Sequence, residues 1–173
     1  MKDYLRIKDK VAIVTGSGRG IGRGVAIALA EYGVKVMISC RTIEDGEAVK
    51  KEIIDAGGTA EFFQSDLMKN EDIKALVAKT VDTFGKIDIL VNNCGGGEPV
   101  IDFWDIDDAA WERSIHFNLS TQFYMTREVF PHMKAQGKGK IVNISSGYAI
   151  GGGDQCAHYA SAKAGVIGLT TSI

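Results

Sequence analysis

A tyrosine and a lysine carry the chemistry that this sequence suggests most directly. Tyr159 and Lys163 are four residues apart in a segment with helical periodicity, so we expect their side chains on one helix face. A nearby ammonium group favours a phenolate and lowers a tyrosine pKa from its ordinary value of about 10. Such a tyrosine can exchange a proton with an alcohol or carbonyl oxygen near neutral pH. Because Tyr-x-x-x-Lys pairs also occur by chance in many helices, the pair needs a supporting context.

Two serines supply part of that context. Ser145 and Ser146 come directly after the apolar run 140–144. A hydroxyl at the end of a strand can hydrogen-bond the oxygen of a substrate. Either serine can equally cap a helix or a turn, so the pattern alone leaves both functions open.

A glycine-rich segment follows the first apolar run, residues 10–15. Glycine allows a tight turn and lets the backbone approach a phosphate closely, and a helix that begins there offers free N–H groups and the positive end of its dipole. The spacing departs from the G-x-G-x-x-G fingerprint, and a glycine turn without a ligand is the alternative. The strand before it and the helix after it favour a phosphate site. The candidate cofactor-binding residues of this loop are Gly16, Ser17, Gly18, Arg19, Gly20, Ile21 and Gly22.

The second apolar run indicates which dinucleotide would bind. An NAD site typically has an Asp or Glu about 20 residues after the glycine loop, which holds the ribose 2′-hydroxyl. Here the run ends in Arg41 and Thr42, and Arg19 lies within the loop. Guanidinium groups suit the 2′-phosphate of NADP, so we expect NADP. The arginines can instead be solvated surface charges, and Glu44 and Asp45 in the following helix keep NAD open.

Five apolar runs alternate with amphipathic segments along the chain. The runs are apolar nearly throughout, which is typical of strands buried on both faces, and they cover residues 10–15, 35–39, 60–64, 87–91 and 140–144. This alternation predicts one α/β domain over residues 1–173, with a doubly wound parallel sheet and helices on both faces. Right-handed crossovers place the carboxyl ends of all strands at one edge, where ligands bind. The three glycine-rich loops, 16–24, 95–97 and 147–153, therefore indicate one cleft.

The helical segments carry further expectations. The first should bury a stripe made of Ile21, Val25, Ala28 and Leu29. The fourth begins near Trp111, and Pro131 should kink or end it. The fifth begins near Cys156 and continues to Ile173. Left-handed caps are expected at Gly33 and at residues 57–58, an acidic helix N-terminus at residues 105–108, and packing rather than binding roles for Trp104 and Trp111.

The composition excludes several classes of function. The chain is 45% hydrophobic and 24% charged, with a formal net charge of −2, so neither wholesale disorder nor nucleic acid as a main partner is expected. No apolar run is long enough to span a membrane, and the charged N-terminal segment lacks the apolar core of a signal peptide. The three histidines share no metal-ligand spacing. We expect a cytoplasmic protein whose cysteines, Cys40, Cys94 and Cys156, are reduced and buried.

Taken in register, these motifs resemble the short-chain dehydrogenase/reductase family, and within it the 3-oxoacyl-[acyl-carrier-protein] reductases. The resemblance covers essentially the whole chain. Residues 15–22 match the TGxxxGxG loop of the family, and residues 92–95 match its NNAG motif with Cys94 in place of alanine. The remaining matches are the adenine-contacting Asp66, the helix asparagine Asn118, and the catalytic set Ser146, Tyr159 and Lys163.

The resemblance implies a Rossmann-type fold and a hydride transfer between nicotinamide and a carbonyl or secondary alcohol substrate. Tyr159 would be the acid/base, and Lys163 would hold the nicotinamide ribose and lower the tyrosine pKa. Ser146 would orient the substrate oxygen, and Asn118 would position a water that links Lys163 to solvent. Further cofactor contacts are implied at Asp66, Leu67, Asn93, Cys94 and Gly95.

The resemblance also implies a homo-oligomer, a tetramer, built through the long helix after Asp107 and the catalytic helix. The apolar residues of these helices exceed what one sheet face should bury: Phe123, Phe130, Met133, Val166, Ile167 and Leu169. Family members continue past the catalytic helix with further strands, a nicotinamide loop and a substrate lid. We therefore expect these 173 residues to be an incomplete domain with poor catalysis on its own.

A non-catalytic dinucleotide-binding redox sensor or scaffold is the alternative function. It would need the glycine loop but not Ser146, Tyr159 and Lys163 together. The substrate stays open, since 3-oxoacyl thioesters, steroids, sugars and polyols are all used within the family.

Overall fold

Five parallel strands form one sheet in the computed structural model, which describes residues 5–173. They agree with the five apolar runs to within two residues at each end: β1 (Val11–Thr15), β2 (Lys35–Cys40), β3 (Thr59–Gln64), β4 (Ile89–Asn92) and β5 (Lys140–Asn143). The strand order is β3-β2-β1-β4-β5, so the chain reverses its direction of winding between β1 and β4. The doubly wound α/β fold is therefore confirmed. Residues 1–4 lie outside the described residues, and the single domain over 1–173 stays a prediction.

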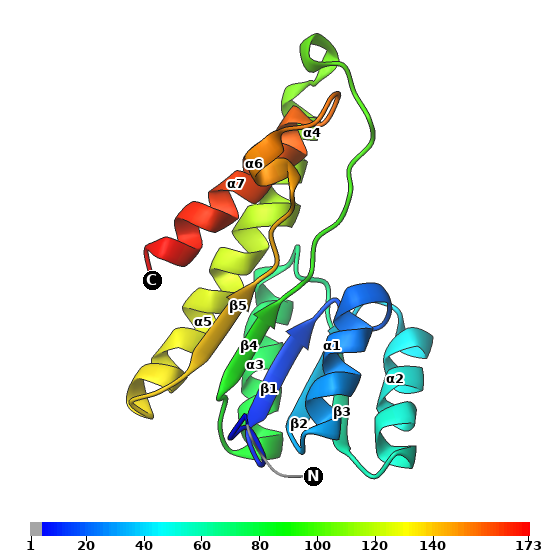
Figure 1. Cartoon of the computed structure of the whole chain (residues 1–173), viewed down its shortest axis with the longest axis vertical. Coiled ribbons are helices and arrows are strands. Elements are labelled where there is room, and N and C mark those ends of the chain that lie inside the picture. The colour runs from blue at the N-terminus through cyan, green and yellow to red at the C-terminus, as the bar shows by residue number, and fades with distance from the viewer. Residues whose placement is uncertain (1–4) are drawn as a thin grey trace.

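Helices cover both faces of this sheet (Figure 1). Helices α1 (Gly20–Glu31) and α2 (Ile43–Asp55) pack on one face, and α3 (Asn70–Phe84) and α5 (Thr121–Ala135) pack on the other. Helices α4 (Asp108–Ile115) and α7 (Ala157–Thr171) pack against each other beyond the carboxyl ends of the strands, next to the short helix α6 (Tyr148–Gly151).

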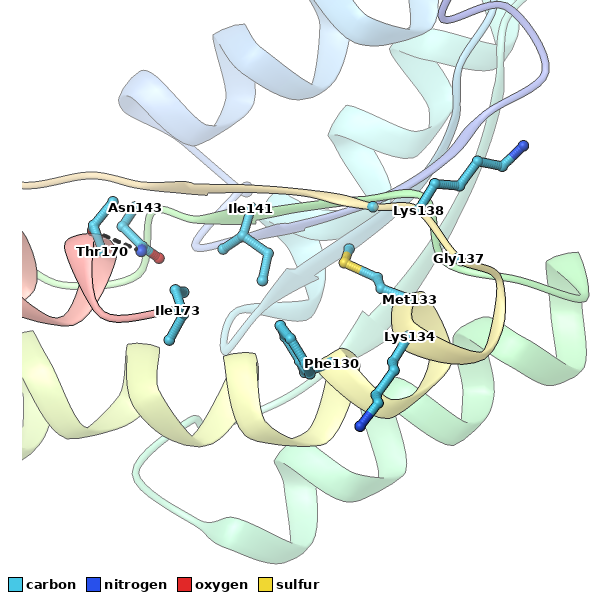
Figure 2. Close-up of a pocket in the computed structure, with 10 residues that line it drawn as sticks. Phe130, Met133, Lys134, Gly137, Lys138, Ile141, Asn143, Thr170 and Ile173 are labelled. Carbon is cyan, nitrogen blue, oxygen red and sulfur yellow. Dashed lines mark hydrogen bonds between the residues drawn. The ribbon is translucent and has the colours of Figure 1, made fainter.

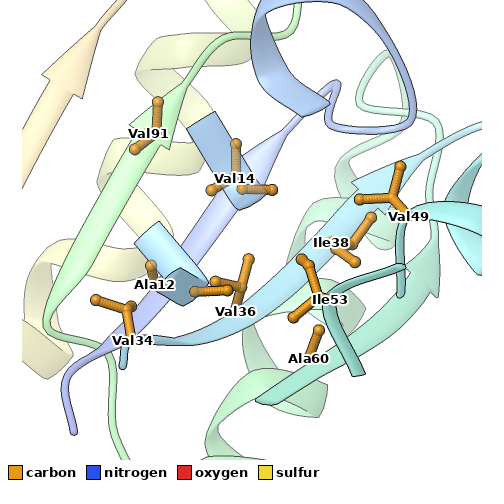
Figure 3. Packing of buried hydrophobic residues seen from close by; sticks show 11 residues of the cluster. Ala12, Val14, Val34, Val36, Ile38, Val49, Ile53, Ala60 and Val91 are labelled. Carbon is orange, nitrogen blue, oxygen red and sulfur yellow. The ribbon is translucent and has the colours of Figure 1, made fainter. Parts of the chain in front are cut away.

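The core has two layers, one on each face of the sheet. Val14, Val36 and Ile38 point toward α1 and α2 and meet Val49 and Ile53 of α2 (Figure 3). The alternate strand residues Ile13, Met37 and Leu90 point the other way, into a cluster with α3 and α5. Burial on both faces explains why the strands are apolar nearly throughout.

The predicted apolar stripe of α1 is confirmed for Val25 and Leu29, which are partly buried against the core, and wrong for Ile21 and Ala28, which are exposed. Ile21 is 67% exposed, whereas the residues fully turned to the sheet are Gly22, Ala26 and Ala30. These three small residues let the helix axis approach the strands closely, so the fully buried positions of the helix hold small residues rather than large apolar ones.

Pro131 does not end the long helix, because α5 continues past it to Ala135. Proline lies on the exposed side, where water can reach the carbonyl group that loses its partner, while Val129 and Met133 keep the opposite side buried. The helical hydrogen-bond pattern changes instead at a π-helical segment, η2 (His116–Ser120), between α4 and α5.

Other expectations are confirmed or corrected locally. Gly33 and Gly57 have positive φ angles at helix ends as expected, and Asp107 caps α4 by accepting a hydrogen bond from Ala110 N–H at 2.7 Å. Helix α7 ends at Thr171 rather than continuing to Ile173. Trp104 does not pack, since it is 80% exposed in the 3₁₀ turn η1 (Phe103–Asp105).

The structure also bears on the expectations about membranes, cysteines and metal ions. None of the helices within residues 5–173 has both the length and the apolar character needed to cross a membrane, and the cytoplasmic location stays a prediction. Cys40, Cys94 and Cys156 are free but half-buried rather than fully buried. In the same range no cluster of three or more His, Cys, Asp or Glu side chains could hold a metal ion.

Candidate active site

The glycine loop turns from β1 into α1 at the carboxyl edge of the sheet. Gly16 and Gly20 have φ angles of +63° and +57°, a backbone region that favours glycine. The hydroxyl of Ser17 donates to the Val14 carbonyl at 2.6 Å and accepts from Ser39 N–H at 3.0 Å. Ser17 is fully buried, so its side chain fastens the loop to the neighbouring strands instead of facing the cleft.

Two glycines, Gly18 and Gly22, are packed so tightly that a side chain would not fit at either position. A Cβ at Gly18 would lie 2.7 Å from Cys40 Sγ, and one at Gly22 would lie 2.4 Å from the Gly16 carbonyl oxygen. Within residues 5–173 no side chain caps the N-terminus of α1 at Arg19, so the first N–H groups of the helix can bind a ligand. This tight backbone with free donors fits the phosphates of a dinucleotide.

A cavity of about 190 Å³ opens in front of this loop, at the carboxyl ends of β1 to β4. It brings together ten of the predicted cofactor-binding residues: Gly16, Gly18, Arg19, Arg41, Thr42, Asp66, Leu67, Asn93, Cys94 and Gly95. Gly20, Ile21 and Gly22 belong to the first turn of α1 and do not line it. Sequence reasoning missed Ser39, Cys40, Ser65 and Phe117, which are part of the wall.

Charges of both signs line the cavity. Arg19 and Arg41 are exposed there, and within residues 5–173 no ion pair holds either guanidinium group. Asp45, which the sequence placed only in the next helix, also lines the cavity. Asp66 accepts a hydrogen bond from Met68 N–H at 3.1 Å, which fixes the carboxylate at the end of β3.

The loop after β4 is fastened to the glycine loop. The Thr15 hydroxyl accepts hydrogen bonds from Asn93 N–H at 3.0 Å and from Cys94 N–H at 2.9 Å. Burial raises the pKa of the Cys94 thiol to about 11. Cys94 is therefore a neutral, poorly reactive thiol in the wall of the cavity.

Tyr159 and Lys163 share one face of α7, as their spacing predicts. The Lys163 side chain is nearly buried, and its Nζ lies 5.9 Å from the centroid of the Tyr159 ring. Nζ donates a hydrogen bond to the Ile144 carbonyl at 3.0 Å. Burial lowers the pKa of Lys163 below its ordinary value.

The two serines have different surroundings. The hydroxyl of Ser145 donates to the Lys163 carbonyl at 2.7 Å and so joins β5 to α7. The Ser146 hydroxyl accepts from Tyr148 N–H at 3.3 Å, and in the described part of the chain no acceptor takes its own proton, which can therefore point at a ligand. The Tyr148 ring meets the Tyr159 ring edge-on, with 6.2 Å between centroids. This arrangement favours Ser146 as the substrate-facing hydroxyl.

Asn118 lies fully buried in the π-helical segment next to Lys163. Its Oδ1 accepts a hydrogen bond from Gly96 N–H at 2.9 Å. Gly95 separates the two side chains: a Cβ there would lie 2.9 Å from Asn118 Oδ1 and 3.1 Å from Lys163 Nζ. The structure therefore brings Asn118, Gly95 and Lys163 together around one point.

Two buried residues in this region were missed. Glu98 accepts a hydrogen bond from Asn118 Nδ2 at 3.3 Å, and Gln122 Nε2 reaches both the Asn118 and the Ile144 carbonyl oxygens. No local sequence pattern distinguishes either residue. Only the packing of the long helix against the loop after β4 reveals them.

A larger and more apolar cavity lies elsewhere (Figure 2). It measures about 670 Å³ and is bounded by the end of α5, the outer side of β5 and the end of α7. Phe130, Ile141 and Ile173 point into it. None of the predicted site residues lines this cavity, so we do not assign the active site to it.

A parallel sheet that reverses its winding between β1 and β4, with a glycine loop at that point, defines an α/β protein of the dinucleotide-binding class. The chain belongs to the short chain dehydrogenase family, whose model matches residues 10–173. It is 37% identical over 166 residues to a 3-oxoacyl-[acyl-carrier-protein] reductase of Synechocystis sp. and 36% identical over 170 residues to a 3beta-hydroxysteroid dehydrogenase of Mediterraneibacter gnavus. These matches cover 95% and 97% of this chain but only 66% and 60% of the relatives.

Solved structures of similar proteins have the same fold. A metagenomic short-chain oxidoreductase in complex with NADP superimposes with a TM-score of 0.91 at 36% identity, over 96% of this chain and 75% of that one. A 7 alpha-hydroxysteroid dehydrogenase complexed with NADH and 7-oxo glycochenodeoxycholic acid gives 0.93 at 36% identity, over 98% and 66%.

Proposed function

We propose that the protein is an NADP(H)-dependent oxidoreductase that interconverts a carbonyl compound and a secondary alcohol. One observation carries the proposal: the buried Lys163 ammonium lies beside the Tyr159 ring at the same sheet edge as the glycine-loop cavity. A redox sensor or scaffold would need the cavity but not this pair. The chain spans about two thirds or less of the relatives with named activities, so the activity is proposed for the intact protein.

Three side chains, those of Tyr159, Lys163 and Ser146, have different roles in the proposed proton transfer. In reduction, the Tyr159 hydroxyl gives its proton to the substrate oxygen, and in oxidation the phenolate takes it back. The Lys163 ammonium, held by the Ile144 carbonyl, stabilises the phenolate electrostatically. Ser146 donates its free hydroxyl proton to the same substrate oxygen and orients it. A bound nicotinamide dinucleotide would supply or accept the hydride.

The charges of the cavity support NADP over NAD. Arg19 and Arg41 are exposed and free of ion pairs within the described residues, and both line the cavity. They suit a 2′-phosphate, whereas Asp45 opposes it. Of the two similar solved structures, one holds NADP and the other NADH, so a nicotinamide dinucleotide has direct support from relatives and the choice of NADP rests on these arginines.

The substrate is a small alcohol or ketone. Named relatives include the 3-oxoacyl-[acyl-carrier-protein] reductase, the 3beta-hydroxysteroid dehydrogenase and a cyclohexanol dehydrogenase of Acinetobacter. The shared chemistry of these names is a hydroxyl or carbonyl group on a carbon skeleton.

We also propose a homo-oligomer through the long helix and α7. Phe123 and Phe130 of α5 and Ile167 of α7 are each at least 40% exposed, which leaves an apolar surface on neighbouring helices. Met133 and Val166, which the sequence assigned to this surface, are buried within the chain instead. Light scattering of the wild type and of Phe123→Lys tests the proposal, and a smaller mass for the variant is expected.

The decisive experiment uses nicotinamide absorbance with a panel of ketones and alcohols. Tyr159→Phe removes one hydroxyl and should abolish turnover while NADPH still binds. Lys163→Ala should lose both turnover and most NADPH affinity. Tyr32→Phe removes the same hydroxyl from a surface tyrosine at the end of α1 and should change nothing. Wild-type protein that binds NADPH but turns over no substrate would favour the sensor instead, and Tyr159→Phe with activity within a few-fold of wild type would refute the assignment of the acid/base.

A further inference from the structure

We propose that Glu98 is a positioning residue that holds Asn118, and through it the turn at Gly95 and Gly96, against Lys163. The inference rests on the proposed oxidoreductase function and adds to it a residue outside every motif that the sequence displays. Glu98 lies in the loop between β4 and η1, three residues after Gly95.

The burial of Glu98 is unusual for an acid in a surface loop. Its side chain is only 2% exposed, and one carboxylate oxygen is paired with the guanidinium of Arg113 on α4. Arg113 itself is more than half exposed. A carboxylate is costly to bury unless it is paired and hydrogen-bonded, and both conditions are met here. The pair therefore fixes the carboxylate at a definite place.

The second carboxylate oxygen determines how the Asn118 amide lies. Oε1 of Glu98 accepts from Asn118 Nδ2 at 3.3 Å, while Asn118 Oδ1 accepts from Gly96 N–H at 2.9 Å. An ionised carboxylate can only accept and a backbone N–H can only donate. A flipped amide would place oxygen against oxygen and N–H against N–H. Glu98 and Gly96 together thus allow one orientation of Asn118.

This orientation matters because the amide oxygen of Asn118 lies against Gly95, as the ammonium of Lys163 does. Asn118 Oδ1 and Lys163 Nζ flank Gly95 so closely that a Cβ there would lie 2.9 Å from the one and 3.1 Å from the other. The negative end of the amide dipole therefore helps to stabilise a desolvated ammonium. Without Glu98, Asn118 can rotate, and Lys163 loses this stabilisation together with the fixed turn. A less stable ammonium supports the Tyr159 phenolate less well.

The test compares Glu98→Ala and Glu98→Gln with the intact wild-type protein. Glu98→Ala should lower kcat about tenfold with a smaller change in KM, since a misplaced catalytic group loses much of its effect. In alcohol oxidation, the acidic limb of the kcat pH profile should move to higher pH, because the phenolate forms less readily. Glu98→Gln keeps an oxygen acceptor for Asn118 and should recover most of the activity.

Two further measurements separate positioning from general stability. The double variant Glu98→Ala/Asn118→Ala should be no slower than Asn118→Ala alone, because Glu98 acts through Asn118. Hydrogen exchange of the Gly96 amide should accelerate at least tenfold in Glu98→Ala. Asp88→Asn is the matched control: it neutralises a second buried carboxylate, which is paired with lysines instead of arginine and precedes the start of β4, and it should leave kcat and Gly96 exchange unchanged.

The outcomes distinguish this inference from the proposed function. A wild type without turnover rejects the oxidoreductase and with it the catalytic consequence for Glu98. An active wild type with an unchanged pH profile and unchanged Gly96 exchange in both Glu98 variants rejects the role of Glu98 alone. Additive losses in the double variant also reject it, because they would mean that Glu98 acts independently of Asn118.

Discussion

Asn93 ties the loop after β4 to Thr15 at the end of β1 by two hydrogen bonds. Its backbone N–H donates to Thr15 Oγ1 and its side-chain Nδ2 donates to the Thr15 carbonyl, both at 3.0 Å. The strands β1 and β4 are neighbours in the sheet, so these bonds close the gap at the point where the winding reverses. The glycine loop and the loop after β4 are therefore held together at the candidate cofactor site.

The close packing of these two loops predicts that alanine has different effects at two glycines of α1. A Cβ at Gly22 would lie 2.5 Å from Asn93 Nδ2 and 2.4 Å from the Gly16 carbonyl, whereas one at Gly24 meets nothing within 4 Å. We expect Gly22→Ala to destabilise the protein by about 1–3 kcal/mol through overpacking and to weaken NADPH binding at least tenfold. Gly24→Ala should stabilise it by about 0.5–1 kcal/mol through helix propensity. Urea unfolding and fluorescence titration measure both effects, and equal effects of the two substitutions would contradict the packing.

The second prediction concerns the choice of cofactor. Arg41→Asp removes a guanidinium group from the cavity and adds a negative charge beside Asp45. A lost charge-assisted hydrogen bond typically costs about 1.5–3 kcal/mol, so NADP affinity should fall at least tenfold while NAD affinity improves. Lys79→Asp makes the same change of charge on the exposed side of α3 and should leave the ratio of the two affinities unchanged. Equal affinities of the wild type for NAD and NADP would contradict the assignment.

The third prediction uses the free cysteines. Cys40 and Cys94 line the cavity, whereas Cys156 lies at the start of α7 and donates to the Gly153 carbonyl. Because its pKa is raised to about 11, Cys94 should react slowly with iodoacetamide at pH 8. Bound NADP should slow the labelling of Cys40 and leave Cys156 unchanged, as measured by mass spectrometry of peptides. Protection of Cys156 without protection of Cys40 would place the cofactor elsewhere.

The fourth prediction concerns stability and pH. Burial alone would raise the pKa of Asp88, but hydrogen bonds from Lys86, Val11 N–H and Lys10 outweigh it and hold the pKa below the ordinary value. A carboxyl group with a lowered pKa in the folded state stabilises the fold above its ordinary pKa and loses that effect as the pH falls through the lowered value. Asp88→Asn should therefore cost about 1–2 kcal/mol at pH 7 and progressively less below about pH 4. Denaturant unfolding at several pH values measures this, and a constant difference at all pH values would show that the charge is not responsible.

How much the sequence alone could predict depends on the range of the interactions involved. The strands were predictable because a strand buried on both faces must be apolar nearly throughout, as at residues 35–39. The glycine loop and the Tyr159–Lys163 pair were predictable because a tight turn and a shared helix face each depend on spacing within a few residues. These local features were sufficient to indicate the fold, the family and the cleft.

The tertiary structure decided what depends on neighbours distant in the chain. The face of α1 is set by how closely the small residues Gly22 and Ala26 approach the sheet, which hydrophobic periodicity does not show. Pro131 stays within α5 because the burial of Val129 and Met133 outweighs one lost hydrogen bond. Glu98 reaches Asn118 only because the loop after β4 folds back onto the π-helical segment, twenty residues further along the chain. Such contacts are made by packing, so no pattern in the intervening residues records them.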